Sequence, residues 1–206
     1  MLNLLFKKIL SLEDYVFECL LGFSFFKSLD KIDIYNTKDS SVSHATFYQP
    51  VRCRNLRELI KEGRRLNKEI DCFVDIGSGE GKACFYVSYF KHFKKIVGVE
   101  LSEKLYRKCL DKLNKVDLDF DLVNMNAVEF KLPDSPCFIF LFNPFDEQAL
   151  EKFIIYNHSH FTSFPSLIAY ANDCHRNDLV KLGFEVKFRN DLTKNSLWAF
   201  HDYYLK

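Results

Sequence analysis

The hydrophobic periodicity of this 206-residue chain changes near residue 72. Before that point the pattern predicts helices over residues 1 to about 68, with one interruption rich in Asp, Asn, Thr and Ser at residues 30–43. After it, short β-branched or aromatic runs alternate with amphipathic stretches. This alternation is typical of a parallel sheet covered by helices, and unbroken apolar runs such as residues 138–142 suit strands buried on both faces.

Seven strands are expected, at residues 72–76, 95–100, 119–124, 137–143, 166–171, 184–188 and 197–203. Helices are expected near residues 81–91, 103–113, 146–157 and 174–182. The last two strands should pair as an antiparallel hairpin, because residues 189–196 between them are too few for a crossover helix. The predicted fold class is α/β: a doubly wound, mostly parallel seven-stranded sheet with an antiparallel C-terminal hairpin. Residues 1–69 form a helical N-terminal extension, and residues 70–206 form the main domain.

Composition excludes several classes of protein. With only 7 Gly and 5 Pro and with 16% aromatic residues, the chain is not collagen-like, mucin-like or disordered. Its 29 Lys and Arg nearly balance 28 Asp and Glu, so a net charge of +1 gives no general attraction to nucleic acid or anionic membranes. Seven cysteines without a CxxC pair suit buried thiols in a reducing compartment and argue against a disulfide framework or a zinc ribbon.

The N-terminal segment contains two apolar runs, residues 1–6 and 15–26. Lysines follow the first run instead of preceding it, and acidic residues interrupt the second, so neither resembles an export signal or approaches the length of a membrane span. We therefore expect a cytoplasmic protein whose first helices pack on the body. The alternative is an interfacial amphipathic helix anchored by phenylalanines, namely Phe6, Phe23, Phe25 and Phe26.

A strand that runs directly into a glycine-rich turn is the sharpest local feature, at residues 73–81. A dinucleotide-binding fingerprint would need a glycine at Lys82, and a phosphate-binding P-loop would need a glycine at Ile76 and a hydroxyl residue at Ala83. Neither pattern fits. What remains is acidic-x-Gly-x-Gly-x-Gly, formed by Asp75, Gly77, Gly79 and Gly81. Glycines allow a ligand to approach the backbone closely, and Asp75 can attract a cationic ligand.

The next predicted strand ends in Glu100, 23 positions after Gly77. A carboxylate at this place can bind both hydroxyls of a ribose. The alternative is a group that only caps the following helix, for which Ser102 is the expected N-cap. The glycine turn beside it favours the ribose-binding interpretation.

At this point the sequence resembles class I, Rossmann-like, S-adenosylmethionine-dependent methyltransferases over residues 70–206, with FVDIGSGEGK as first motif and IVGVE as second. The resemblance implies that Asp75 and the three glycines line the methionine and ribose part of the cofactor and that Glu100 holds the ribose hydroxyls. It also implies that Asn126, which replaces the usual Asp after the third strand, accepts a hydrogen bond from the adenine amino group. The alternative for Asn126 is an ordinary loop residue.

The fourth strand ends in Phe-Asn-Pro-Phe at residues 142–145. This is similar to the Asn/Asp-Pro-Pro-aromatic motif of amino-group methyltransferases, although the second proline is absent. The resemblance implies that Asn143 and Phe145 are catalytic, with the side-chain amide and a backbone carbonyl orienting the acceptor nitrogen. The alternative is an Asn-Pro turn that ends the strand, with Phe145 simply buried.

Upstream segments at residues 29–37 and 47–50 extend the resemblance to a subgroup of bacterial-type methyltransferases with an FNPF fourth motif. The same segments are more distantly similar to protein-lysine methyltransferases. By this likeness Tyr48 closes over the cofactor; otherwise it is a packed aromatic residue. We therefore predict transfer of a methyl group to an acceptor nitrogen of protein lysine or a small amine, with no bound metal. Asp173, after the fifth strand, is a candidate to take up the leftover proton.

Two other functions stay open. Basic residues at helical spacing between Arg57 and Lys68 could hold RNA, as in an RNA-modifying methyltransferase. A solvated helix face is the simpler interpretation, because Glu58 and Glu62 dilute the charge and no aromatic residues interleave. The second possibility is a methyltransferase-like module that binds cofactor without turnover. The six histidines form no recognisable set of metal ligands in the sequence.

Overall fold

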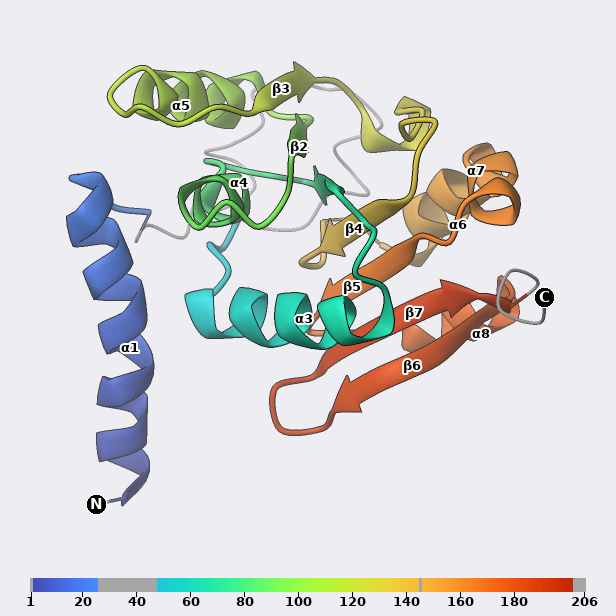
Figure 1. Ribbon diagram of the computed structural model, residues 1–206, viewed down its shortest axis with the longest axis horizontal. Helices are drawn as coiled ribbons and strands as arrows, with labels where there is room; N and C mark the ends of the chain where they lie inside the picture. Colours follow the sequence, from blue (N-terminus) through green and yellow to red (C-terminus); the bar gives the residue numbers. More distant parts are fainter. Residues whose placement is uncertain (1, 26–47, 145, 202–206) are drawn as a thin grey trace.

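The computed structural model describes residues 2–25, 48–144 and 146–201 (Figure 1). Its centre is a seven-stranded sheet in the order β3-β2-β1-β4-β5-β7-β6. The strands are β1 (Cys72–Ile76), β2 (Lys95–Glu100), β3 (Asp121–Asn124), β4 (Cys137–Leu141), β5 (Leu167–Ala171), β6 (Phe184–Asn190) and β7 (Asn195–Phe200). The first five are parallel, and β7 is antiparallel to both β5 and β6. The predicted fold, including its C-terminal hairpin, is confirmed.

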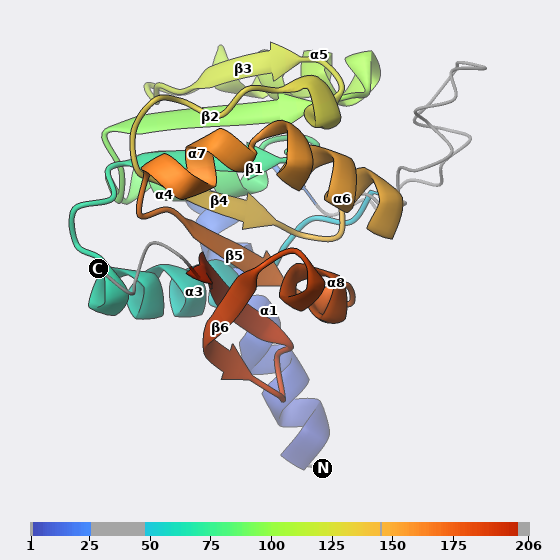
Figure 2. The ribbon, with the colours of Figure 1, turned by 90° about the vertical axis from the view of Figure 1, so that its right-hand side faces the viewer.

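Helices cover both faces of this sheet. They are α1 (Leu2–Leu21), α3 (Cys53–Leu66), α4 (Lys82–Tyr89), α5 (Glu103–Leu113), α6 (Glu147–Tyr156), α7 (His158–Ser163) and α8 (Arg176–Lys181), with a short 3-10 helix, η2 (Ala127–Glu129). Neighbouring residues of β1 face opposite ways. Phe73 belongs to a buried cluster that includes residues of α1, α3, α4 and α5, whereas Val74 belongs to a second cluster that includes residues of α6, α7 and α8. Figure 2 shows this second group of helices in front of the sheet and α1 behind it.

The helix predicted over residues 146–157 is α6, and a second helix that was not predicted, α7, follows it after Asn157. The Asn157 side chain is buried and accepts a hydrogen bond from Leu132 N at 2.9 Å, while its amide nitrogen donates to Phe130 O at 3.0 Å. A polar side chain that bonds to backbone outside its own helix competes with helix continuation. The break therefore depends on a segment distant in sequence.

The N-terminal helices pack on the body as expected. A buried ion-pair cluster joins α1 to the start of α4, where Lys82 Nζ lies 2.6 Å from Asp14 and 3.4 Å from Glu18. Asp14 also accepts a hydrogen bond from the backbone of Cys53 at the start of α3. In turn, the α3 residue Glu58 accepts bonds from side chains of the β6–β7 turn. The proposed division of the chain at residue 69 stays a prediction.

The interfacial-helix alternative is not supported where the structure describes its anchors. Phe25 is fully buried, and both Phe23 and Phe25 pack against Phe85 of α4. Phe26 lies outside the described residues. Within the described residues, every helix falls short of the length or the apolarity that a bilayer span requires.

Candidate functional site

The candidate site lies where the parallel strands β1, β2 and β4 end. β1 leads directly into a turn whose glycines have φ values of +75° at Gly77, +59° at Gly79 and +83° at Gly81. These are left-handed conformations that glycine adopts without the steric cost of a Cβ. α4 starts immediately after Gly81, so its first backbone N–H groups adjoin the turn.

Glu100 binds the backbone of this glycine turn. One carboxylate oxygen accepts from Gly79 N at 2.7 Å, and the other accepts from Ser102 N at 2.7 Å. Burial raises the pKa of Glu100, while these backbone N–H groups oppose the rise. Ser102 itself caps α5 by accepting from Leu105 N, as predicted. Glu100 therefore does more than cap a helix, because it also connects β2 to the turn after β1.

Asp75 is the second buried carboxyl group at this place, with 3% of its surface exposed. Burial raises its pKa to about 7, and the nearby Glu100 adds to the rise. Cys84 Sγ lies 3.7 Å from one Asp75 oxygen, a long contact for a weak donor. Asp75 thus titrates near neutral pH beside the glycine turn.

Each glycine of the turn is in close contact with a different element. A Cβ on Gly77 would collide with Pro144 after β4, one on Gly79 with the ring of Tyr48, and one on Gly81 with Cys109 of α5. The structure therefore brings three sequence-predicted segments together: the glycine turn, the Asn-Pro segment and Tyr48. The contact between Gly79 and Tyr48 connects residues that lie on either side of α3.

Two buried hydroxyl groups at the turn have no hydrogen-bond partner among the described residues, those of Tyr48 and Ser78. Burial raises the pKa of Tyr48, and the nearby Glu80 carboxylate raises it further. The Tyr48 hydroxyl lies close to the Glu80 backbone without completing a hydrogen bond of normal geometry. Buried polar groups are nearly always bonded in proteins, so these two atoms are groups that a bound ligand could satisfy.

Asn143 follows β4 and has a left-handed backbone with φ of +45°. Asn tolerates this conformation better than most residues with a Cβ. Its side-chain oxygen accepts a hydrogen bond from Cys174 Sγ at 3.0 Å, and the next residue, Pro144, packs on Gly77. Asn143 therefore adjoins the glycine turn. Phe145, its predicted catalytic partner, lies outside the described residues.

Asn126 is placed close to the end of β2, because Met125 N donates to Glu100 O at 3.1 Å. The Asn126 side chain caps η2 by accepting from Val128 N at 3.2 Å. It is half-buried, and its contact with adenine stays a prediction. A carbonyl oxygen has a second lone pair, so this cap does not prevent a second hydrogen bond.

Asp173 does not suit the proton-accepting role suggested for it. The residue is buried, and its carboxylate accepts hydrogen bonds from Arg189 of β6 at 2.7 and 3.3 Å. Both carboxylate oxygens are therefore occupied by the guanidinium of Arg189. Asp173 was expected to accept a proton because it follows β5. Its partner Arg189 lies on another strand, β6.

The basic stripe on α3 is only partly available. Arg64 turns inward, donating to Ile70 O at 2.7 Å and lying over the ring of Phe93. Arg57 pairs with Glu13 of α1, and Arg65 pairs with Glu62. These contacts reduce the positive field that an RNA backbone would need.

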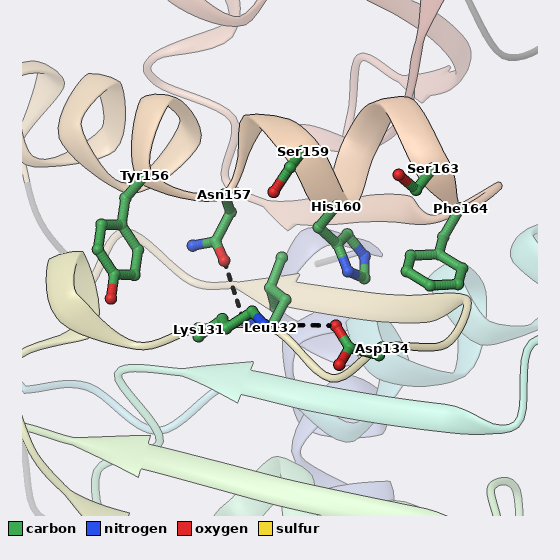
Figure 3. Close-up of a pocket in the computed structure, with 9 residues that line it drawn as sticks. All are labelled: Lys131, Leu132, Asp134, Tyr156, Asn157, Ser159, His160, Ser163 and Phe164. Carbon is green, nitrogen blue, oxygen red and sulfur yellow. Dashed lines mark hydrogen bonds and ion pairs between the residues drawn. The ribbon is translucent and has the colours of Figure 1, made fainter.

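Two features were not predicted from the sequence. Glu147, His175 and Asp178 bring one ligand atom each to within 4.8 Å of one another, with Asp178 also bound to Lys181. The second feature is a hollow of about 330 Å³ lined by Lys131, Leu132, Asp134, Tyr156, Asn157, Ser159, His160, Ser163 and Phe164 (Figure 3). Its residues precede β4 and β5, so it lies at the opposite edge of the sheet from the glycine turn. Both features join residues distant in sequence.

Residues 74–143 match a family model described as a methyltransferase domain. Among solved structures, the chain is similar to a candidate RNA methyltransferase from Pyrococcus horikoshii, at 15% identity and a TM-score of 0.54 over 82% of this chain and 94% of the other. It is also similar to the methyltransferase domain of bacterial CtHen1-C, at 16% identity and a TM-score of 0.52 over 70% and 96% of the two chains. A third similar structure is a hypothetical protein of Thermus thermophilus, at 14% identity and a TM-score of 0.50 over 74% and 88%. A search among curated proteins found no match.

The residues at the glycine turn fit the predicted cofactor. S-adenosylmethionine carries positive charge and a ribose diol, and the turn offers the carboxyl groups of Asp75 and Glu100 together with two buried hydroxyls that lack partners among the described residues. The solved structures share the fold at low identity. The finer resemblance to FNPF-type and protein-lysine methyltransferases stays a prediction. The match to the family model confirms the predicted class, a methyltransferase that uses S-adenosylmethionine.

Proposed function

We propose that this protein transfers a methyl group to an acceptor nitrogen, in a protein lysine or a small amine, and that Asn143 orients that nitrogen. The observation that carries the proposal is the position of Asn143. Its amide oxygen is held by Cys174, and its neighbour Pro144 packs on Gly77 of the glycine turn. An uncharged hydrogen-bond acceptor beside the cofactor turn suits a nucleophile that bears N–H groups.

When bound, S-adenosylmethionine supplies an activated methyl group on a sulfonium. Asp75 and Glu100 would hold the cofactor, the first through its negative charge above neutral pH and the second through hydrogen bonds from the ribose hydroxyls. The glycine turn would let the ligand approach its backbone, and the ring of Tyr48 on Gly79 would exclude water from one side. Glu100 already fixes the turn through Gly79 N, so this part of the site is formed in advance.

On the acceptor side, the protein needs chiefly to position the nitrogen and remove it from water. Asn143 would accept an N–H hydrogen bond, which leaves the nitrogen lone pair free to point elsewhere. An amine attacks only in its neutral form, so an uncharged amide is a better partner than a carboxylate, which would stabilise the ammonium form. The nearby carboxylate of Asp173 is already paired with Arg189.

An RNA base is the second candidate acceptor, favoured by one observation: the fold is shared with a candidate RNA methyltransferase from Pyrococcus horikoshii. The ion pairs of Arg57 and Arg65 count against it, because they reduce the charge that α3 offers to phosphates. The near-zero net charge of the chain argues in the same direction.

The test is transfer of labelled methyl from S-adenosylmethionine to three defined probes: a lysine-rich peptide, spermidine and a single-stranded RNA. We expect label in the peptide or the amine, and we expect Asn143→Ala to abolish most of it while S-adenosylhomocysteine still raises the melting temperature. Glu100→Ala should remove both transfer and the thermal shift. Transfer to RNA alone would replace the proposed acceptor. Ligand binding without transfer to any probe would favour the non-catalytic module.

A further inference from the structure

We infer that Cys174 is a positioning residue of the candidate acceptor site, whose thiol holds the Asn143 amide in one orientation. The inference rests on the proposed function of Asn143. The contact joins two neighbouring parallel strands, because Asn143 follows β4, Cys174 follows β5, and Leu141 pairs with Tyr170 in the sheet. Cys174 Sγ lies 3.0 Å from Asn143 Oδ1. The two side chains thus meet at the edge of the sheet that carries the glycine turn.

The direction of the hydrogen bond follows from counting protons. A thiol has one hydrogen, and Asn143 Oδ1 can only accept, so Cys174 is the donor in this contact. The hydroxyl of Tyr170 lies 3.5 Å from the same sulfur and must then donate to it. Tyr170 is fully buried, and burial raises its pKa, so its proton is retained. Together the three groups form a directed series from Tyr170 through Cys174 to Asn143.

This series of hydrogen bonds favours one end of the Asn143 side-chain amide, the oxygen end, at Cys174. The backbone of Asn143 is already fixed by its left-handed conformation and by the packing of Pro144 on Gly77. The side-chain amide could still rotate by half a turn and exchange its oxygen and nitrogen ends. With the amide oxygen at Cys174 the thiol donates to a carbonyl oxygen, whereas the N–H groups of a reversed amide would have only the weakly accepting sulfur to face. The thiol therefore favours the orientation with the oxygen at Cys174.

A weak donor suits this task. A carbonyl oxygen has two lone pairs, so the bond from Cys174 does not by itself prevent a bond from the N–H of an acceptor nitrogen. A thiol withdraws little electron density from that oxygen, because S–H is a weak donor. Serine at this position would keep the donor, whereas alanine would remove it.

The contact can be tested without an acceptor, through the alkylation rate of Cys174 by iodoacetamide. Cys19 and Cys174 are the exposed cysteines and the other five are buried, so the full chain carrying Cys19→Ser reports on Cys174. We expect Asn143→Ala to raise the rate several-fold by freeing the thiol. Asn143→Asp should lower it below the wild-type rate, because a carboxylate disfavours the reactive thiolate. Equal rates in all three proteins would overturn the inference. Cys19, measured in a Cys174→Ser chain, is the matched control and should not respond.

The consequence for transfer is tested with whichever probe accepts label. Cys174→Ala should lower kcat about five-fold, the effect of one ordinary hydrogen bond, with the KM for S-adenosylmethionine unchanged. Cys174→Ser should restore most of kcat. Equal loss in both variants would mean that size, not donation, matters, and would overturn the positioning role. If wild-type protein labels no probe, the proposed function fails, and the alkylation rates still decide whether Cys174 holds Asn143.

Discussion

The carboxylate of Glu100 accepts a hydrogen bond from the backbone N–H of Gly79 at 2.7 Å, so the end of β2 holds the turn that follows β1. The other carboxylate oxygen binds Ser102 N at the start of α5. One buried side chain therefore fixes both loops that would surround a cofactor. Because of these two contacts, we expect Glu100 to contribute to the stability of the fold as well as to cofactor binding.

Glu100→Gln should weaken both properties. The new amide NH₂ must face one of two N–H donors, which leaves a buried donor unsatisfied and costs about 1–3 kcal/mol of the free energy of unfolding. We also expect the Kd for S-adenosylhomocysteine to rise at least ten-fold, measured by calorimetry. Glu103→Gln is the matched control, because Glu103 is exposed and pairs only with Arg107 of its own helix among the described residues. Equal effects of the two substitutions would contradict this assignment.

Asp75 should give the protein a pH-dependent stability. Burial, and then the Glu100 charge, raises its pKa from 3.8 to about 7. Between these values the folded state keeps a proton that the unfolded state has lost, so the unfolding free energy falls as pH rises, and it levels off above about pH 7. The total effect is on the order of a few kcal/mol. Urea unfolding at several pH values should show a steeper slope in wild type than in Asp75→Asn, where the raised pKa of Glu100 still contributes. Parallel profiles would rule out this titration.

The same titration should affect ligand binding in the opposite direction. Ionised Asp75 attracts a cation, so affinity for S-adenosylmethionine should rise as pH increases through about 7. S-adenosylhomocysteine lacks the sulfonium charge and should respond less. Comparing the two ligands by calorimetry in wild type and Asp75→Asn separates this effect from general pH dependence, because the variant should bind both with the same profile.

The sequence predicted the elements whose signals are local. The period of the apolar residues located all seven strands, and the short connection before β7 identified the hairpin. The glycine turn was recognisable because three left-handed positions in alternation need glycine. By contrast, α7 was not predicted, and the bonds of Asn157 to Phe130 and Leu132 at the junction of α6 and α7 are not visible in any local pattern.

The site was predicted in parts, and its connections were not. Asn143 and Glu100 came from motifs, yet no sequence pattern connects Asn143 with Cys174, which lies 31 residues further along the chain. The sequence made Asp173 a candidate base, whereas the structure shows it paired with Arg189 of β6. Such pairs depend on which strands become neighbours in the sheet, and chain periodicity gives no direct measure of this.

The buried cluster of Lys82, Asp14 and Glu18 should be essential to the attachment of α1. Lys82→Met leaves two carboxylates buried without their cation, which should cost about 3–5 kcal/mol of the unfolding free energy. The triple variant Lys82→Met, Asp14→Asn, Glu18→Gln should recover part of this loss. It removes the uncompensated charges, and the amide oxygen introduced by Asp14→Asn can still accept from Cys53 N. Urea unfolding measures both. A triple variant less stable than Lys82→Met would contradict the argument.

Tyr48 offers a way to separate a cofactor contact from simple packing. Its hydroxyl is buried without a partner among the described residues, and its ring packs on Gly79. Tyr48→Phe keeps the ring and removes a buried hydroxyl without a described partner, so the ligand-free protein should be unchanged or more stable by up to about 1 kcal/mol. If Tyr48 contacts the cofactor, the same variant should bind S-adenosylhomocysteine several-fold more weakly. Thermal unfolding with and without ligand measures both quantities. Unchanged affinity with unchanged stability would assign Tyr48 to packing alone.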